Sequence, residues 1–183
     1  MREALNIAEN DYRALGRKEP VAVRFINKEY RVSPDARITS SRCGEAPDKH
    51  KILILHYLLS EGGKHETGEL IDFKQLPGGI TYNPVFEGRV YSRLIAVFGK
   101  NYELFTLCGG KLGGVVVQLG DSAMKFEILP GIFVCIIFHS ADEEFPPGCK
   151  ILFDSAIKAY FPTEDAIIIC EELARELTGC QKQ

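Results

Sequence analysis

The chain has 183 residues and a formal net charge of −3, with 45% hydrophobic and 26% charged residues. This length predicts a single domain that spans residues 1–183, and the composition is typical of a folded globular protein. The negative net charge argues against nucleic-acid-binding proteins that act by neutralising phosphates, so we expect no nucleic-acid partner. No apolar run approaches the roughly 20 residues that a membrane-spanning helix needs, so we expect no membrane partner.

The start of the chain and its cysteines indicate the compartment. The first five residues include Glu3 and lack the apolar stretch and cleavage site of a secretory signal. The six cysteines form no CxxC pair and no metal-ribbon spacing, so we interpret them as free thiols. We therefore expect a cytoplasmic protein.

The first third of the chain predicts a helix, a hairpin, a loop and a second helix. Apolar residues recur at helical spacing over residues 5–15. Alternating residues over 21–25 and 29–32 predict a hairpin. Residues 33–48 lack periodicity and contain two prolines, so we expect a long loop there. A strongly apolar helix follows over residues 51–60.

The middle of the chain predicts a short strand at 69–73, a proline–glycine turn and a helix. Proline is favoured at the first helical position, so Asn83-Pro84 indicates a helix over residues 84–98. Arg89 and Arg93 lie four residues apart on this helix and therefore share a face. The glycine-rich run 108–114 lacks the spacing of a phosphate-binding loop and is expected to be a mobile connection.

The pattern after residue 102 has a period of two, which is typical of strands. We expect strands over residues 115–119, 123–128, 132–138 and 150–153. The strand at 132–138 is apolar on both faces and should be central. The expected fold is therefore α+β, an antiparallel β-meander packed against several α-helices in a single domain.

The last helix of the expected fold follows Thr163, which is placed to cap it, and ends at Gly179. Its core side is expected to consist of Ala166, Cys170, Leu173 and Leu177. Asp154 is expected to cap a helical turn that precedes this helix.

The charges are unevenly distributed along the chain. Residues 13–51 contain ten Lys or Arg and five acids, whereas residues 141–176 contain nine acids and three bases. The two segments can lie near each other or face solvent, or the acidic one can form a pocket or docking face.

The run His139-Ser-Ala-Asp142-Glu143-Glu144 leaves the end of the central strand, where a rigid element can hold site residues. Clustered carboxylates beside an imidazole can bind a divalent cation or share acid–base chemistry. We take His139, Asp142 and Glu143 as candidate metal ligands; the alternative is a solvated acidic loop. Cys43, Asp48 and His50 form a weaker candidate for a nucleophile or metal site.

Other acids have local explanations as turn or cap residues, although the ends of their elements can converge. The full set of candidate ligand-binding residues is His139, Asp142, Glu143, Glu144, Asp121, Asp154, Glu164, Asp165, Arg89 and Arg93.

A set of ordered motifs resembles the domain of unknown function 3786 family, and the resemblance runs through most of the chain from about Ile52 onward. The motifs are Leu76-Pro-Gly-Gly79 with Tyr82, Phe98-Gly99, Gly120-Asp121, Asp142-Glu-Glu-Phe-Pro146, Leu152-Phe-Asp154 and Phe161-Pro-Thr-Glu-Asp165. The resemblance implies cofactor-linked metabolism in anaerobic bacteria and archaea, without naming a cofactor or a reaction; some members are fused to an iron–sulfur module. This chain lacks that module, and it has Phe138-His139 where members often carry a Trp.

Three functions remain open from the sequence. The first is a binding or accessory protein whose acidic motif contacts a metal, a metal-containing cofactor or a cationic partner. The second is an enzyme in which Asp142, Glu143 or Glu144 acts as acid or base while Arg89 or Arg93 orients a small anionic substrate. The third is a structural subunit of a larger complex.

Overall fold

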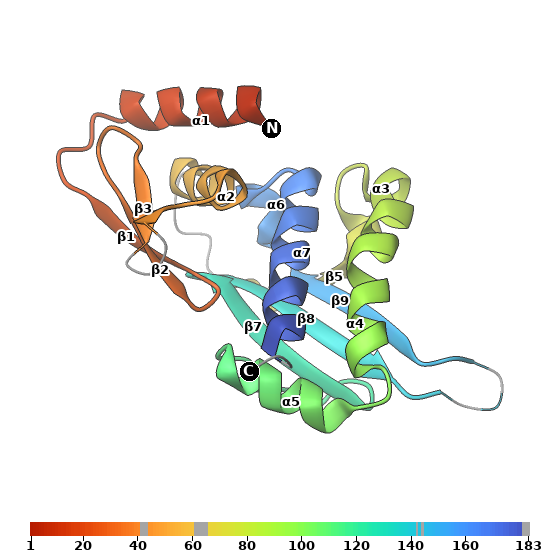
Figure 1. The fold of residues 1–183 in the computed structure, drawn as a ribbon. Helices are drawn as coiled ribbons and strands as arrows, with labels where there is room; N and C mark the ends of the chain where they lie inside the picture. Colours follow the sequence, from red (N-terminus) through yellow and green to blue (C-terminus); the bar gives the residue numbers. More distant parts are fainter. Residues whose placement is uncertain (41–43, 61–65, 142, 144, 181–183) are drawn as a thin grey trace.

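The computed structural model describes residues 1–40, 44–60, 66–141, 143 and 145–180. It has an α+β fold with two antiparallel sheets, which confirms the expected fold class (Figure 1). The smaller sheet has the order β1-β2-β3-β4 and consists of β1 (Val21–Phe25), β2 (Lys28–Val32), β3 (Ile38–Ser40) and β4 (Gly44–Glu45). The larger sheet has the order β5-β9-β8-β7-β6 and consists of β5 (Leu70–Asp72), β6 (Val115–Val116), β7 (Ser122–Leu129), β8 (Ile132–His139) and β9 (Gly148–Asp154).

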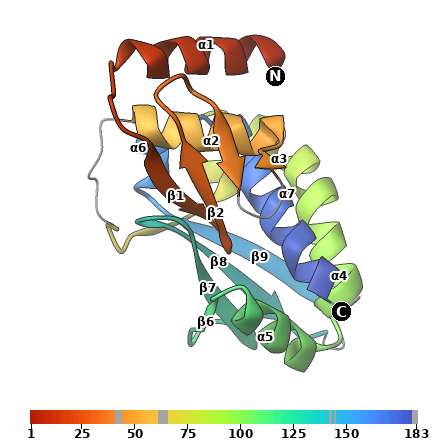
Figure 2. The same cartoon turned by 60° about the vertical axis from the view of Figure 1, so that its left-hand side comes forward.

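Helices pack on these sheets in two groups. Helices α4, α5 and α7 lie over one face of the larger sheet, whereas α1 lies outermost and covers α2 beside the smaller sheet (Figures 1 and 2). The helices are α1 (Arg2–Ala14), α2 (Asp48–Leu59), α3 (Gly79–Phe86), α4 (Ser92–Phe98), α5 (Tyr102–Lys111), α6 (Ile157–Tyr160) and α7 (Thr163–Gly179). A 3-10 turn, η1 (Phe73–Gln75), precedes α3, and a π-helical segment, η2 (Glu87–Tyr91), joins α3 to α4.

One hydrophobic core joins the two sheets. The predicted central strand, β8, pairs with β7 and β9, and its side chains are mostly buried on both faces. Phe126 and Phe138 of this sheet meet Phe105 of α5. The smaller sheet is attached to β7 by the amide of Ile26, which donates to the carbonyl of Ile128 at 2.6 Å. The interior is therefore continuous from β1 to α7.

The helix expected over residues 84–98 begins earlier, at Gly79. Gly78 has a φ of +72°, a conformation that glycine adopts without strain. A Cβ at Gly79 would lie 2.0 Å from the carbonyl oxygen of Phe73, so only glycine fits there. Pro84 consequently lies inside α3 instead of starting a helix.

Residues 102–111 form helix α5, so the expectation of a period-two segment from residue 102 and of a mobile glycine-rich connection was wrong for this stretch. The side chain of Asn101 accepts from the amide of Leu104 and caps the helix. A Cβ at Gly109 would lie 2.3 Å from the sulfur of Met124. Close packing on β7 therefore outweighs the low helix propensity of glycine.

Two further expectations change near the smaller sheet and the last helix. The loop expected at residues 33–48 contains β3 and β4. Thr163 is the first residue of α7 and not its cap; its hydroxyl donates to the carbonyl of Pro77 at 2.6 Å. The predicted core side of α7 is confirmed, since Ala166, Cys170, Leu173 and Leu177 are buried.

Candidate functional site

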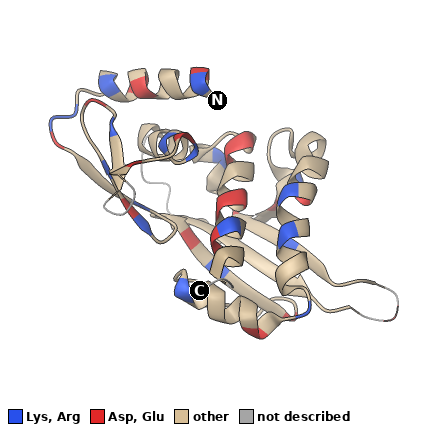
Figure 3. Ribbon diagram, in the orientation of Figure 1, with Lys and Arg blue, Asp and Glu red and all other residues tan. Residues whose placement is uncertain are grey.

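Helix α7 runs between α2 on one side and the α3–η2–α4 helix on the other (Figure 1). Its apolar residues face the core, and its polar residues between 171 and 176 face these neighbouring helices and the β1–β2 hairpin. Figure 3 marks acidic positions along α7 opposite basic positions on η2 and α4. The last helix thus brings its carboxylates to residues that lie far away in the sequence.

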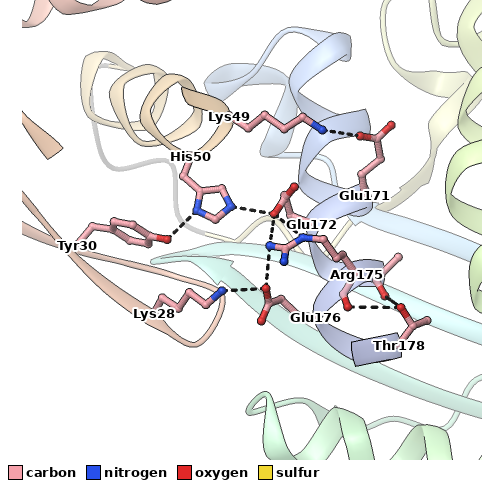
Figure 4. Close-up of polar contacts among 10 residues, drawn as sticks. Lys28, Tyr30, Lys49, His50, Glu171, Glu172, Arg175, Glu176 and Thr178 are labelled. Carbon is pink, nitrogen blue, oxygen red and sulfur yellow. Dashed lines mark hydrogen bonds and ion pairs between the residues drawn. The ribbon is translucent and has the colours of Figure 1, made fainter. Parts of the chain in front are cut away.

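The innermost part of this region is a buried chain of hydrogen bonds centred on His50 (Figure 4). The hydroxyl of Tyr30 lies 2.6 Å from Nδ1 of His50, and Nε2 of His50 lies 2.8 Å from a carboxylate oxygen of Glu172. Phe25 packs edge-on against the imidazole, with the ring centroids 5.0 Å apart. Because both ring nitrogens have partners, the imidazole is buried without an unsatisfied polar atom.

Glu172 is held in its charged form by these neighbours. Burial raises the pKa of Glu172, but hydrogen bonds from His50 and Arg175 outweigh burial and lower the pKa to about 2. The guanidinium of Arg175 donates to the same oxygen through Nη2 at 2.5 Å and Nε at 3.1 Å. Since the carboxylate is ionised, the Nε2 of His50 must carry the proton that it donates.

A second set of ion pairs surrounds this buried chain (Figure 4). Glu171 accepts from Lys49 of α2 at 3.3 Å and from Arg89 of η2 at 3.2 Å. Glu176 accepts from Lys28 at 2.8 Å and from Arg175 at 2.8 Å. Glu171 and Glu176 therefore each accept from two cationic side chains, and Glu172 accepts from Arg175 and His50.

These side chains line a hollow of about 360 Å³, which we call the α7 groove. Its lining residues are Lys49, Gly88, Arg89, Arg93, Glu171, Glu172 and Arg175. Four of them are cationic and two are anionic, in a protein whose net charge is −3. Arg93 forms no ion pair or hydrogen bond within the part of the chain that the structure describes. The groove therefore has an excess of positive charge.

The π-helical segment places the arginines in the groove. The backbone N–H and the hydroxyl of Ser92 both donate to the carbonyl of Glu87, five residues earlier. π-helical turns are rare and often occur at functional sites. Arg89 and Arg93 line the same hollow, as their spacing predicted. Gly88 lines it too, and a Cβ added to Gly88 would have no other atom within 4 Å.

The other predicted site residues within the described part of the chain do not line the groove with the arginines. Asp121 accepts from the amide of Ser140 at 2.6 Å, and this bond, with a smaller contribution from His139, lowers the pKa of Asp121. His139 ends β8 at the side of the larger sheet where β8 and β9 extend beyond the helices (Figure 1). Glu143 follows this strand end and is exposed. Asp142 and Glu144 lie outside the described residues, as does Cys43.

Asp154 lies at the other end of β9 from the residues that pair with His139. Its carboxylate accepts from the amides of Thr67, Gly68 and Ala156, at 2.8–3.0 Å, and from the hydroxyl of Thr67 at 2.8 Å. The bond from the amide of Ala156 agrees with the expected role of Asp154 as a cap before α6. The bonds from Thr67 and Gly68 fix the segment that leads into β5. Oδ1 of Asp154 accepts three of these bonds and Oδ2 accepts one.

Glu164 and Asp165 belong to the first turn of α7, as expected. Asp165 is buried and accepts from Nδ1 of His56 at 2.5 Å, which links α7 to α2. Glu164 is exposed, and its hydrogen bond with Tyr82 raises the pKa of the phenol. The predicted acids that the structure describes thus do not line the α7 groove. Within the described ranges, no three His, Cys, Asp or Glu side chains are placed to hold a metal ion together.

Sequence reasoning missed most of the groove. Glu171, Glu172 and Arg175 have the spacing of an exposed polar helix face, and Lys49 falls between the expected loop and the expected helix. One feature of the sequence, its uneven distribution of charge, did indicate this region. The basic segment 13–51 contacts the acidic segment 141–176 through Lys28–Glu176, Lys49–Glu171 and His50–Glu172. These contacts correspond to one of the alternatives that the sequence left open, in which the two segments lie near each other.

Comparison with known proteins identifies one family whose model matches the chain. The family model described as Domain of unknown function (DUF3786) matches residues 6–176 of the chain. No curated protein and no solved structure matches it. None of the described helices is long and apolar enough to pass through a membrane.

Proposed function

We propose that this chain, which belongs to the DUF3786 family, binds a small anionic ligand in the α7 groove. The observation that carries the proposal is the convergence of Lys49, Arg89, Arg93 and Arg175 from four different elements on one hollow. Guanidinium groups present forked donors that match carboxylates and phosphates, and a cluster of them is the usual means of binding such groups.

The donors needed by an anion remain available in the groove. A guanidinium has five N–H donors and an ammonium has three. Arg89 and Lys49 each use one bond to Glu171, and Arg93 uses none within the described residues. The side chain of Arg89 is 63% exposed, so it can turn toward a ligand without leaving a buried charge unpaired. An anion would therefore add to the existing ion pairs instead of replacing them.

The buried part of the site supports this function by holding α7 in place. Glu172 draws Arg175 to the edge of the groove, while His50 and Tyr30 keep Glu172 oriented. A rigid supporting layer of this kind fixes the geometry of the residues that contact a ligand. The enzyme hypothesis expected Asp142, Glu143 or Glu144 beside the arginines, but the one described residue of this set, Glu143, does not line the groove. Binding is thus the better proposal for this groove.

A pair of substitutions at Gly88 tests the proposal without removing any existing contact. No atom lies within 4 Å of a Cβ at this position, so both Gly88→Glu and Gly88→Gln can be accommodated. The two side chains have nearly the same size and differ in charge. We expect Gly88→Glu to bind inorganic phosphate or sulfate at least about tenfold more weakly than Gly88→Gln, because it places a carboxylate among the cations.

Isothermal titration calorimetry at low ionic strength measures this difference. Arg93→Gln should also lower the affinity about tenfold, since a charged hydrogen bond contributes about 1.5–3 kcal/mol. Arg2→Gln, on the exposed first turn of α1, is the matched control and should bind like the wild type. Equal binding by the Glu and Gln variants of Gly88 would contradict the proposal.

The remaining hypotheses stay predictions. Contact of His139, Asp142 and Glu143 with a metal or a metal-containing cofactor is tested by metal analysis and an absorption spectrum after anaerobic purification. A role as a structural subunit is tested by isolating a stable complex. A metal-free, colourless protein that takes up no metal would count against the first of these.

A further inference from the structure

A second hollow, of about 410 Å³, adjoins the α7 groove at Arg175. We call it the α5 hollow; the residues that matter here are Lys28, Lys111, Arg175 and Glu176. Lys28 is the first residue of β2, directly after the turn of the β1–β2 hairpin, and Lys111 belongs to the last turn of α5. Arg175 lines both hollows, so the two form neighbouring parts of one surface along α7.

The two hollows share the same arrangement of charge. In the α7 groove, the acids are paired and Arg93 has no ion partner among the described residues. In the α5 hollow, Glu176 is paired with Lys28 and Arg175, and Lys111 has no ion partner in the same part of the chain. Among the described residues, each hollow thus has one cation without an ion partner and one or two acids that are paired, and Arg175 lines both hollows.

The spacing of the hollows follows from the helix that lines both. Glu171 and Glu172 line only the first hollow, and Glu176 and Gly179 line only the second. These two pairs of positions are centred roughly six residues apart, which corresponds to about 9 Å along the helix axis. Two anionic groups at the ends of a six-carbon skeleton are separated by a similar length.

We infer that the ligand of this surface is a small bis-anionic molecule. One phosphate or carboxylate group lies against Arg89 and Arg93, the other lies against Lys111, and Arg175 contacts both. This inference rests on the proposed function of the α7 groove, because the first anionic group occupies that groove. A second charged group adds affinity without a second loss of translational freedom, so a bis-anionic ligand should bind more tightly than either half.

The test compares three probes by calorimetry: a hexose 1,6-bisphosphate, the matching hexose 6-phosphate and an eight-carbon dicarboxylate, whose carboxylates stand at the two ends of a six-carbon chain. We expect the bisphosphate to bind at least about tenfold more tightly than the monophosphate. Lys111→Gln should remove most of this difference and leave the monophosphate affinity unchanged. Arg93→Gln should weaken all the phosphate probes.

Lys100→Gln is the matched control, because Lys100 is an exposed lysine outside both hollows. Thermal unfolding of each variant confirms folding; Lys111 has only the modest favourable interaction of a base with a helix C-terminus to lose. Tight binding of the dicarboxylate, with the same sensitivity to Lys111→Gln, would support the spacing and identify carboxylate as the anionic group.

The outcomes separate this inference from the proposed function. If the monophosphate binds with dependence on Arg93 but the bisphosphate binds no more tightly, the α7 groove stands and the bis-anionic inference is wrong. The inference is also wrong if Lys111→Gln weakens both phosphate probes equally or neither of them. If no probe binds with dependence on Arg93, both proposals fail.

Discussion

Glu172 and Asp154 are both buried carboxylates whose pKa is lowered, yet the groups that bind them differ in kind. For both, burial raises the pKa and hydrogen bonds more than compensate. Asp154 accepts from three backbone amides and one hydroxyl, whereas Glu172 accepts from the side chains of His50 and Arg175.

This difference separates a structural carboxylate from one that supports a site. Backbone amides are fixed by the fold, so Asp154 fastens the segment around Thr67 to β9, and the amides that bind it are not free to move toward a ligand. Side-chain cations keep further donors free, so the partners of Glu172 can also contact an anion. We therefore expect substitutions at the two carboxylates to have different consequences for stability and for binding.

The largest effect is expected for Asp154→Ala. Four donors would lose their acceptor in a site that is 2% exposed, so we expect the free energy of unfolding to fall by about 3 kcal/mol. Urea denaturation measures this change. Asp72→Ala, which removes an exposed capping box from η1, should lower stability by only about 1 kcal/mol. Anion affinity should be unchanged in both variants. A loss of anion binding in Asp154→Ala would show that Asp154, like Glu172, supports the binding site.

Glu172→Gln should have a smaller effect on stability, about 2 kcal/mol, because an amide can still accept from His50. Its effect on binding should have the opposite sign. Arg175 loses one of its two charged partners and keeps Glu176, so more of its positive charge is available to an anion and we expect anion affinity to rise severalfold. Calorimetry and urea denaturation of the same variant give both quantities. A variant with unchanged stability and weaker binding would show that Glu172 contacts the ligand itself.

The pH dependence of stability tests the contribution of the Glu172 carboxylate. The pKa of Glu172 is about 2 in the folded protein and 4.5 is its ordinary value, so its contribution is complete above pH 4.5 and is lost as the pH falls toward 2. We expect the wild type to lose more stability than Glu172→Gln over this range. The difference between their free energies of unfolding should shrink as the pH is lowered. Parallel pH profiles would contradict the assigned ion pair.

The smallest effect on stability is expected for Lys49→Gln. The side chain of Lys49 is 44% exposed, and such ion pairs contribute at most about 1 kcal/mol. Thermal unfolding should therefore barely change, while anion affinity should fall severalfold. Lys158→Gln, an exposed lysine away from the groove, is the control. If Lys49→Gln changed the stability more than Glu172→Gln does, the expected order of these two effects would be wrong.

Much of the fold could be predicted from periodicity, because burial repeats with the geometry of each element. The core side of α7 and the β7–β8 meander follow from such repeats. Helix α5 could not be predicted, since the contact that favours glycine at position 109 comes from Met124 on another element. The start of α3 at Gly79 depends in the same way on the carbonyl of Phe73.

The site was harder to predict than the fold. Arg89 and Arg93 could be chosen as a pair because their spacing is local. Glu172 could not be distinguished from an exposed helix residue, because the partner that buries it is 122 residues away. The acidic run after the central strand was conspicuous in the sequence, but its described members lie outside the α7 groove.

The separation between His50 and Glu172 also determines when the groove can form. Helix α7 follows every other described element along the chain, and it supplies three of the seven residues that line the groove. During synthesis the earlier elements emerge first, and contacts across so long a separation close late in folding. A nascent chain that has not yet added α7 would leave the imidazole of His50 without its carboxylate. Anion binding would thus report that α7 has docked.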